Sequence, residues 1–195
     1  FSLMLSMAVP VIKMPKLTGP FTVGTSIYHW VDQDRLEWFT ENPNDKRQIM
    51  VQIWYPGEKI KKAKRSSYLD RMDIRAETIG AAGNFPGFIA NHLSLTKTNS
   101  FIDIKPNPVS APFPIIIISH GITSMRQIHT SLAEKLANHG YVVIVPDHSY
   151  DANLTIFPDG SVADYRSDIT GDPDSILIRR SQINTRAADI HFLLN

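Results

Sequence analysis

The amino-acid sequence predicts an α/β fold with a mixed, mainly parallel sheet flanked by helices. Ile115 to Ile118 is a continuous β-branched run, which is typical of a parallel strand buried on both faces. Met125 to His139 has a helical period, and Tyr141 to Val145 is a second apolar run. A strand, a helix and a strand joined by short links predict a right-handed parallel βαβ unit. The apolar positions of its helix are Ile128, Leu132 and Leu136, with Ala133 and Ala137 alongside.

Two strands are predicted ahead of this unit. In Phe21 to Val31, Tyr28 and Trp30 alternate with polar neighbours, and Arg47 to Tyr55 places its apolar residues on one face. Between them, Asn42 to Asp45 has the composition of a turn. We therefore expect an antiparallel hairpin with a long loop.

Three further segments are predicted around these strands. Arg71 to His92 has mixed helical character, so we expect one or two short helices lying over a pocket. Phe157 to Gly160 is a tight-turn sequence that indicates a small hairpin. Ile176 to Leu194 has the pattern of a long amphipathic helix. Its apolar stripe is formed by Ile183, Ala187, Ile190 and Leu194.

Composition limits the class of protein. With 195 residues, 43% apolar and 20% charged, the chain is long and apolar enough for one globular domain. The net charge of +1 gives no reason to expect a nucleic-acid partner. The absence of cysteine excludes disulfides, thiolate metal sites and a cysteine nucleophile. Several histidines lack the spacing with carboxylates that zinc sites use, so we expect no metal and no cofactor. They are His29, His92, His129, His139 and His191.

The N-terminal segment is predicted to lie outside the main domain. Residues 1–16 hold an apolar run, Phe1 to Ile12, and a linker, and residues 17–195 form the domain. The run is shorter than the about 20 residues that span a membrane. It is interpreted either as the end of a longer hydrophobic segment or as a buried N-terminal segment. Because a helical pattern is still running at Asn195, both ends of the chain are interpreted as truncated.

The turn after the first apolar run is the strongest candidate for a site. Ser119, His120, Gly121 and Ile122 end a predicted strand and lead into a predicted helix, where backbone N–H groups point outward. Gly121 lets a substrate approach the backbone closely, and the N–H of Ile122 is placed to donate to a developing oxyanion. The alternative is an ordinary tight turn.

Other polar residues nearby have two interpretations each. Ser124, three residues before Gln127, fits a helix capping box better than a nucleophile. His120 is either a general base or a residue that supports the loop by hydrogen bonding. Asp147 and His148 end a predicted parallel strand, where they either contact a pocket or order the loop.

These motifs together resemble the plasma-type platelet-activating factor acetylhydrolases and their bacterial relatives, over roughly Leu17 to Leu194. The similar segments are Ser119 to Ile122, Leu136 to His148, Thr18 to Thr25 and Met50 to Pro56. The resemblance implies an α/β-hydrolase fold and metal-free hydrolysis of short or oxidised sn-2 acyl esters of phospholipids through an acyl-serine intermediate. Ile122 matches the family's oxyanion-hole donor.

The nucleophile of that family lies in a G-x-S-x-G elbow, and no such motif occurs in this sequence. The nearest similarity, Gly24 to Tyr28, lacks the second glycine. We therefore expect the N-terminal part of a hydrolase, truncated before the nucleophile strand. Its catalytic Ser, Asp and His would lie beyond Asn195, with the elbow within about 20 residues, given usual loop lengths. The chain alone is expected to be inactive.

Two rival functions stay open: a non-catalytic α/β binding module, and a hydrolase for a polyester, a dienelactone or a peptide-like bond. The expected partner is a small-molecule or phospholipid ester, with membrane association. We expect a membrane-associated or extracellular location, because Phe1 to Ile12 is followed by Lys13 and Lys16. The basic stretch from Glu58 to Arg65 is either a patch for anionic lipid headgroups or a solvated loop.

Overall fold

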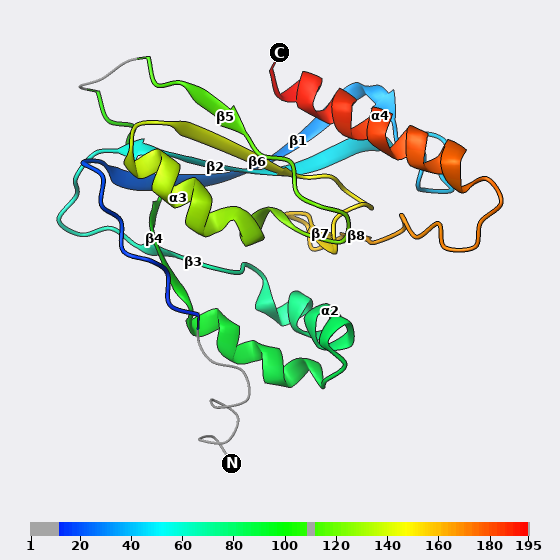
Figure 1. Ribbon diagram of the computed structural model, residues 1–195, viewed down its shortest axis with the longest axis horizontal. Coiled ribbons are helices and arrows are strands. Elements are labelled where there is room, and N and C mark those ends of the chain that lie inside the picture. The colour runs from blue at the N-terminus through cyan, green and yellow to red at the C-terminus, as the bar shows by residue number, and fades with distance from the viewer. Residues whose placement is uncertain (1–11, 109–111, 195) are drawn as a thin grey trace. The chain divides into compact units, whose positions relative to one another are not determined.

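A computed structural model describes residues 12–108 and 112–194 (Figure 1). A sheet of six strands has the order β3-β4-β1-β2-β6-β5, and β7 and β8 form a second, two-stranded sheet. The strands are β1 (Thr22–Leu36), β2 (Lys46–Gly57), β3 (Arg65–Ser67), β4 (Lys97–Ile102), β5 (Ile115–Ile117), β6 (Val142–Asp147), β7 (Leu154–Ile156) and β8 (Val162–Asp164). The helices are α2 (Met72–Gly83), α3 (Thr130–Asn138) and α4 (Ser175–Leu193), with 3-10 segments η1 (Gly87–Leu95) and η2 (Arg126–His129).

The chain divides into two compact units. The first consists of Phe1–Ser26, Ile53–Ile116 and Gln127–Ile144, and the second of Ile27–Gln52, Ile117–Arg126 and Val145–Asn195. The apolar run predicted for Phe1 to Ile12 lies outside the described residues except for Ile12. No helix in the described part of the chain is long and apolar enough to cross a membrane.

The first unit contains two strands that the sequence did not predict. β4 pairs in parallel with β1, with Gly24 opposite Phe101, and it pairs antiparallel with β3. The sheet is therefore mixed. β4 was missed because its buried positions, Thr98 and Ser100, are polar. Their burial is tolerated because hydrogen bonds satisfy them: Thr98 Oγ1 donates to the carbonyl of Ser66, and Ser100 bonds to the buried Glu134.

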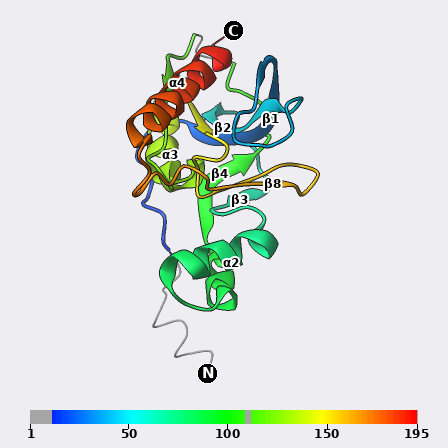
Figure 2. The same ribbon diagram turned by 90° about the vertical axis from the view of Figure 1, so that its right-hand side faces the viewer.

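Two helical segments of the first unit lie in the Arg71–His92 region, where one or two short helices were predicted. α2 and η1 pack against each other (Figure 2). Asn84, with φ of 56°, ends α2 in the left-handed conformation. The basic stretch upstream, between β2 and β3, is a mostly exposed loop.

The helix after β5 differs from its prediction at its start and in its buried face. It begins as η2 and becomes α3 only at Thr130. The predicted capping box is wrong, because the Ser124 N–H donates to the Gly121 carbonyl and the Gln127 side-chain amide donates to Asp70. The inward face of α3 is Ala133 and Ala137 rather than the larger apolar stripe. Of that stripe, Ile128 and Leu132 are exposed.

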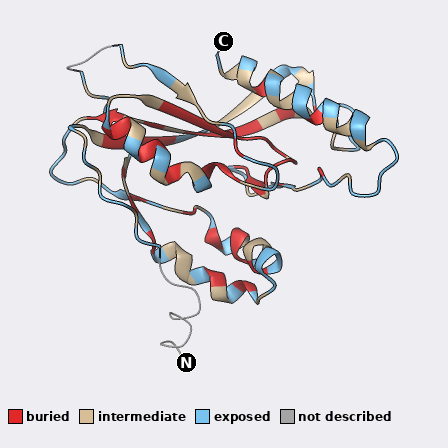
Figure 3. Ribbon diagram, viewed as in Figure 1, coloured by how far each residue is buried: buried red, intermediate tan, exposed pale blue. Residues whose placement is uncertain are grey.

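The two apolar runs of the predicted βαβ unit differ in burial. β6 is buried along nearly its whole length, as predicted for an interior strand (Figure 3). β5 is not buried on both faces: Ile115 is 59% exposed, and the other two residues are only partly buried. The reason is position, since β5 is the last strand in the order of the six-stranded sheet.

The second unit contains the predicted hairpin and the predicted long helix. β7 and β8 pair antiparallel, with Leu154 opposite Asp164, around the turn predicted at Phe157 to Gly160. A small apolar cluster of Met50, Phe157 and Ala163 packs beside them, with Tyr150 against it.

α4 has the predicted length but not the predicted orientation. Its fully buried residues are Gln182 and Asp189, both polar, and most of the helix is exposed or intermediate (Figure 3). Ile183 and Leu194, members of the predicted apolar stripe, are 58% and 62% exposed. The apolar periodicity therefore predicted the position of the helix correctly but predicted the wrong face as the buried one.

Candidate active site

The loop after β5, in the second unit, is built around a tight turn. The Ser124 N–H donates to the Gly121 carbonyl at 3.1 Å, and the Thr123 N–H donates to the Asp151 carbonyl at 3.2 Å. Thr123 has φ of 60°, which places it in the left-handed region. Ile122 lies at the tip of this turn with 46% of its surface exposed. We call residues 119–124 the oxyanion loop, after the prediction made for Ile122.

His120 holds this loop through both of its ring nitrogens. Nδ1 lies 2.6 Å from the carbonyl oxygen of Gly121, which can only accept, so Nδ1 carries a proton. Nε2 accepts the backbone N–H of His148 at 3.0 Å, so Nε2 carries none. The ring is therefore neutral, and burial lowers the pKa of His120 to about 4. Of the two predicted roles, the geometry favours loop support over general base, because both nitrogens are occupied.

The hydrogen bonds to the Gly121 carbonyl set the direction of the Ile122 N–H. In a trans peptide the C=O and the next N–H point in opposite directions. His120 and Ser124 hold the carbonyl on one side, so the Ile122 N–H is directed to the other. This N–H makes no hydrogen bond to the residues that the structure describes. A fixed, unpaired backbone donor is what an oxyanion hole requires.

Gly121 leaves open space beside this donor. A Cβ atom added at Gly121 would meet nothing closer than the Cβ of Ser124, at 4.0 Å. The φ angle of Gly121 is not positive, so the backbone conformation itself does not require glycine. The absence of a side chain at Gly121 therefore lets a substrate approach the Gly121–Ile122 peptide, and it is not needed for the shape of the turn.

Ser119, His148 and Asp189, here called the Ser–His–Asp set, are joined by two hydrogen bonds. The Oγ atom of Ser119 lies 2.8 Å from Nε2 of His148, and Nδ1 of His148 lies 2.8 Å from Oδ2 of Asp189. The side chains of His148 and Asp189 are fully buried, whereas Ser119 is exposed. The same connectivity activates the nucleophile in serine hydrolases. Sequence reasoning did not bring these residues together.

Asp189 is held as a buried carboxylate by arginines. Arg47 of β2 donates to it from Nε at 3.1 Å and from Nη2 at 2.7 Å, and Arg35 Nη1 lies 2.9 Å away. Burial alone would raise the pKa of Asp189, but the His148 hydrogen bond and the Arg47 charge hold this pKa well below its usual range. Arg47 also pairs with the buried Glu37 at 2.8 Å.

Two further ion pairs fasten the oxyanion loop. Arg186 of α4 donates to the carbonyl of His120 at 2.7 Å and pairs with the carboxylate of Asp151. At the end of β6, Asp147 accepts the backbone N–H of Arg126 at 2.7 Å and pairs with its guanidinium. Of the two interpretations of Asp147 and His148, the geometry therefore supports the loop-ordering pair.

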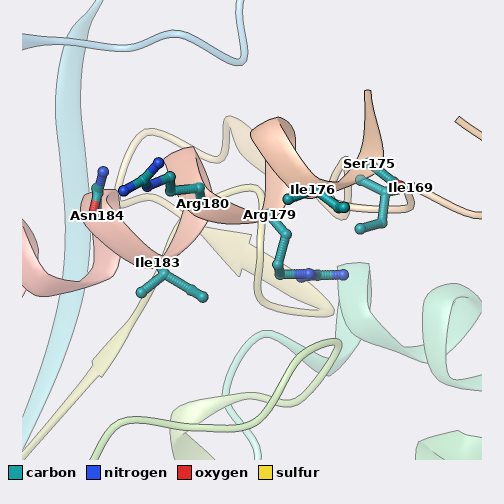
Figure 4. A pocket seen from close by; sticks show the side chains of 7 residues that line it. All are labelled: Ile169, Ser175, Ile176, Arg179, Arg180, Ile183 and Asn184. Carbon is teal, nitrogen blue, oxygen red and sulfur yellow. The ribbon is translucent and has the colours of Figure 1, made fainter. Parts of the chain in front are cut away.

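A separate groove of about 690 Å³ lies along the exposed face of α4 (Figure 4). Ile176, Arg179 and Ile183 project from the helix at this groove, which combines apolar and cationic side chains. Its lining residues are Ile169, Ser175, Ile176, Arg179, Arg180, Ile183 and Asn184. It includes no residue of the oxyanion loop or of the Ser–His–Asp set. The described residues contain no cluster of His, Asp or Glu that could hold a metal ion.

The strand order and the fold of the solved structure it resembles define the α/β-hydrolase fold. The structure resembles that of a ferulic acid esterase from Streptomyces cinnamoneus, with a TM-score of 0.72 and 26% sequence identity. The similarity covers 93% of this chain and 48% of the esterase chain. The family model of platelet-activating factor acetylhydrolase, isoform II, matches residues 7–195, and the chain belongs to that family.

Curated relatives carry the same family name. The chain is 25% identical over 146 residues to the platelet-activating factor acetylhydrolase of Cavia porcellus, which covers 69% of this chain and 28% of that protein. It is 29% identical over 100 residues to the enzyme of the same name from Canis lupus familiaris, covering 47% of this chain and 22% of that protein. The matched segment thus spans less than a third of either relative. The family resemblance and the fold predicted from the sequence are confirmed.

Proposed function

We propose that the protein containing this chain hydrolyses carboxylic esters, specifically short or oxidised sn-2 acyl esters of phospholipids. A serine outside these 195 residues attacks the ester carbonyl and forms an acyl-serine, which water then hydrolyses. The catalytic Asp and His also lie outside the chain. The 195 residues of this chain contribute one donor of the oxyanion hole, the N–H of Ile122.

The observation that carries the proposal is the fixed peptide between Gly121 and Ile122. Its carbonyl is held by His120 and by the turn, and its N–H is unpaired within the described residues. A donor that is oriented before the reaction stabilises the tetrahedral intermediate without reorganisation at the moment of attack. Family membership supports the ester as the substrate class.

The test uses the protein expressed from the full gene. Its turnover of 1-alkyl-2-acetyl-glycerophosphocholine is compared with turnover of the analogue that carries a long unoxidised sn-2 chain. We expect the acetyl ester to have the higher kcat/KM. A pure, folded protein that cleaves neither substrate and no p-nitrophenyl ester would support the rival binding module.

A second candidate substrate is a feruloyl ester, because the solved structure described above is a ferulic acid esterase. Methyl ferulate in the same assay separates the two candidates. A kcat/KM for methyl ferulate above that for the acetyl phospholipid would favour this second function. The loop chemistry would then be unchanged, and only the acyl-binding walls would differ.

We propose membrane association of the full protein, from the apolar residues 1–12 and the lysines that follow them. Fractionation of cells that express the full gene tests this placement. Release of the protein by high salt, or its recovery in the soluble fraction, would contradict an apolar anchor.

A further inference from the structure

His148 binds both residues that precede Gly121. Its ring nitrogen Nε2 lies 2.8 Å from Oγ of Ser119, and its backbone N–H donates to the ring of His120 at 3.0 Å. His120 in turn holds the Gly121 carbonyl. The direction of the Ile122 N–H therefore depends on where His148 sits.

Asp189 determines the position and the tautomer of His148. Because a carboxylate can only accept, Nδ1 of His148 carries a proton, which in the neutral tautomer leaves Nε2 as an acceptor for the Ser119 hydroxyl. The carboxylate is itself fixed by Arg47 and Arg35. Each member of the Ser–His–Asp set thus has one orientation that satisfies its hydrogen-bond partners.

Ser119 has the connectivity of a nucleophile but not the surroundings of one. A catalytic imidazole must pass its proton to the leaving group, which requires an accessible Nε2. The side chain of His148 is 0% exposed. In addition, the two arginines on Asp189 offset the negative charge that would stabilise an imidazolium.

We propose that His148 and Asp189 are positioning residues that hold the oxyanion loop through Ser119 and His120. The proposal rests on the proposed function of Ile122. Ser119 serves in it as a hydrogen-bond donor to His148, and the reacting atoms never touch the Ser–His–Asp set. Loss of the hydrogen bonds within the Ser–His–Asp set lets the oxyanion loop move. The Ile122 N–H is then misaligned in the transition state, while ground-state binding of the substrate changes little.

The test starts with Ser119→Ala in the protein from the full gene, because Ser119 is exposed and its removal leaves the buried pair intact. We expect kcat for ester hydrolysis to fall by about threefold to thirtyfold, with KM within twofold, as for a misaligned donor. Ser119→Thr keeps the hydroxyl and should restore most of kcat. Ser161→Ala, which removes an exposed hydroxyl from the β7–β8 turn, is the matched control and should behave as the unmodified protein.

His148→Asn extends the test to the buried residue. The Asn amide can still donate to Asp189 from near the Nδ1 position, but it has no acceptor where Nε2 was. If the two residues act as one unit, the double variant with Ser119→Ala should lose no more kcat than His148→Asn alone. Additive losses would contradict a shared role.

A second measurement does not depend on turnover. Hydrogen exchange of the peptide covering residues 117–126 should become faster in Ser119→Ala, while exchange in β6 and α4 stays unchanged. If the unmodified protein turns over no ester, the proposed function fails, and this measurement still decides the positioning role. Unchanged loop exchange together with unchanged kcat would overturn the inference.

The nucleophilic alternative has its own signature. A fluorophosphonate adduct on Ser119, or a loss of about 10⁶ in kcat for Ser119→Ala, would identify this serine as the nucleophile and overturn the positioning role. We expect the phosphonate to label a different serine of the full protein. Labelling should persist in Ser119→Ala.

Discussion

Arg47 of β2 and Asp189 of α4 form a two-point ion pair although 142 positions separate them in the sequence. Neither side chain is more than 2% exposed. Burial would lower the pKa of Arg47, but the charges of Asp189 and Glu37 raise it above its ordinary value. Both groups therefore stay ionised, and each offsets the desolvation cost of the other.

This pair predicts a large loss of stability when one partner is removed. Arg47→Met leaves the Asp189 and Glu37 carboxylates buried with less compensation, so the free energy of unfolding should fall by about 3–5 kcal/mol. Urea denaturation followed by circular dichroism measures it. The matched control is Arg71→Met, which breaks the exposed pair with Asp73 and should leave the unfolding midpoint near its original value. Equal shifts in the two variants would contradict the structural role given to Arg47.

The neutral, buried His120 predicts a pH dependence of stability. Its pKa is about 4 in the folded protein against 6.5 for a free histidine. Between these two values the unfolded chain binds the proton and the folded protein does not, so stability falls as the pH drops from 6.5 to 4. The loss attributable to His120 should reach about 3 kcal/mol. Urea denaturation at a series of pH values measures it, and His120→Gln should give a shallower slope over this range. The same slope in both proteins would rule out His120 as the source.

The oxyanion assignment predicts that the backbone of Ile122 matters more than its side chain. Ile122→Val keeps the N–H and should leave kcat within a few-fold. Ile122→Pro removes the donor and should lower kcat by about 10²–10³, with a smaller effect on KM. Circular dichroism and thermal melting must show that the proline variant is folded. Near-normal kcat in a folded Ile122→Pro protein would disprove the assignment.

Gly121→Val separates access from backbone strain. The turn does not need a positive φ at this position, and the added side chain meets open space in the described structure. The melting temperature should therefore change little, whereas kcat/KM should fall because the valine occupies the path of the substrate to the Ile122 N–H. A large drop in melting temperature would mean that Gly121 serves the fold instead.

The 195-residue chain by itself is predicted to show no ester hydrolysis above a heat-treated sample. The structure makes this prediction sharper than the sequence did, because the Ser–His–Asp set offers an apparent nucleophile within the chain. Saturable turnover of p-nitrophenyl acetate by the purified chain, lost in Ser119→Ala, would contradict both the missing nucleophile and the positioning role. The unmodified chain and the variant must be compared at equal purity.

Much of the fold could be predicted because apolar runs and periodicity locate secondary structure. β1, β2, β6, the β7–β8 hairpin and α4 all lie where the sequence indicated. Which face of each helix is buried was harder to predict from the sequence. The inward face of α4 is set by Gln182, Arg186 and Asp189, whose partners are polar or charged, so a rule that turns apolar residues inward selects the opposite side. The short strands β3 and β4 were missed because their buried positions are Ser and Thr.

The candidate site shows the same division. Ile122, Gly121 and the loop-supporting role of His120 follow from a local motif, so a single stretch of sequence was enough to propose them. The Ser–His–Asp set joins the segments that follow β5 and β6 to α4 across long sequence separations, and no local pattern carries that information. One signal was present in the sequence. Arg186 and Asp189 are charges spaced by three on one side of a helix, which indicates a buried ion-pair face as readily as a solvated one.

The span between Arg47 and Asp189 also constrains how the protein comes into being on the ribosome. At about 5–20 residues per second, the codon for Asp189 is read roughly 7–30 s after that for Arg47. Until then the Arg47 guanidinium lacks its two-point partner in α4, and of the carboxylates it pairs with only Glu37 has been translated. The β2 segment around it therefore cannot close into its final packing while translation proceeds through the intervening chain. The nascent polypeptide therefore carries an incompletely packed surface around β2 for that interval.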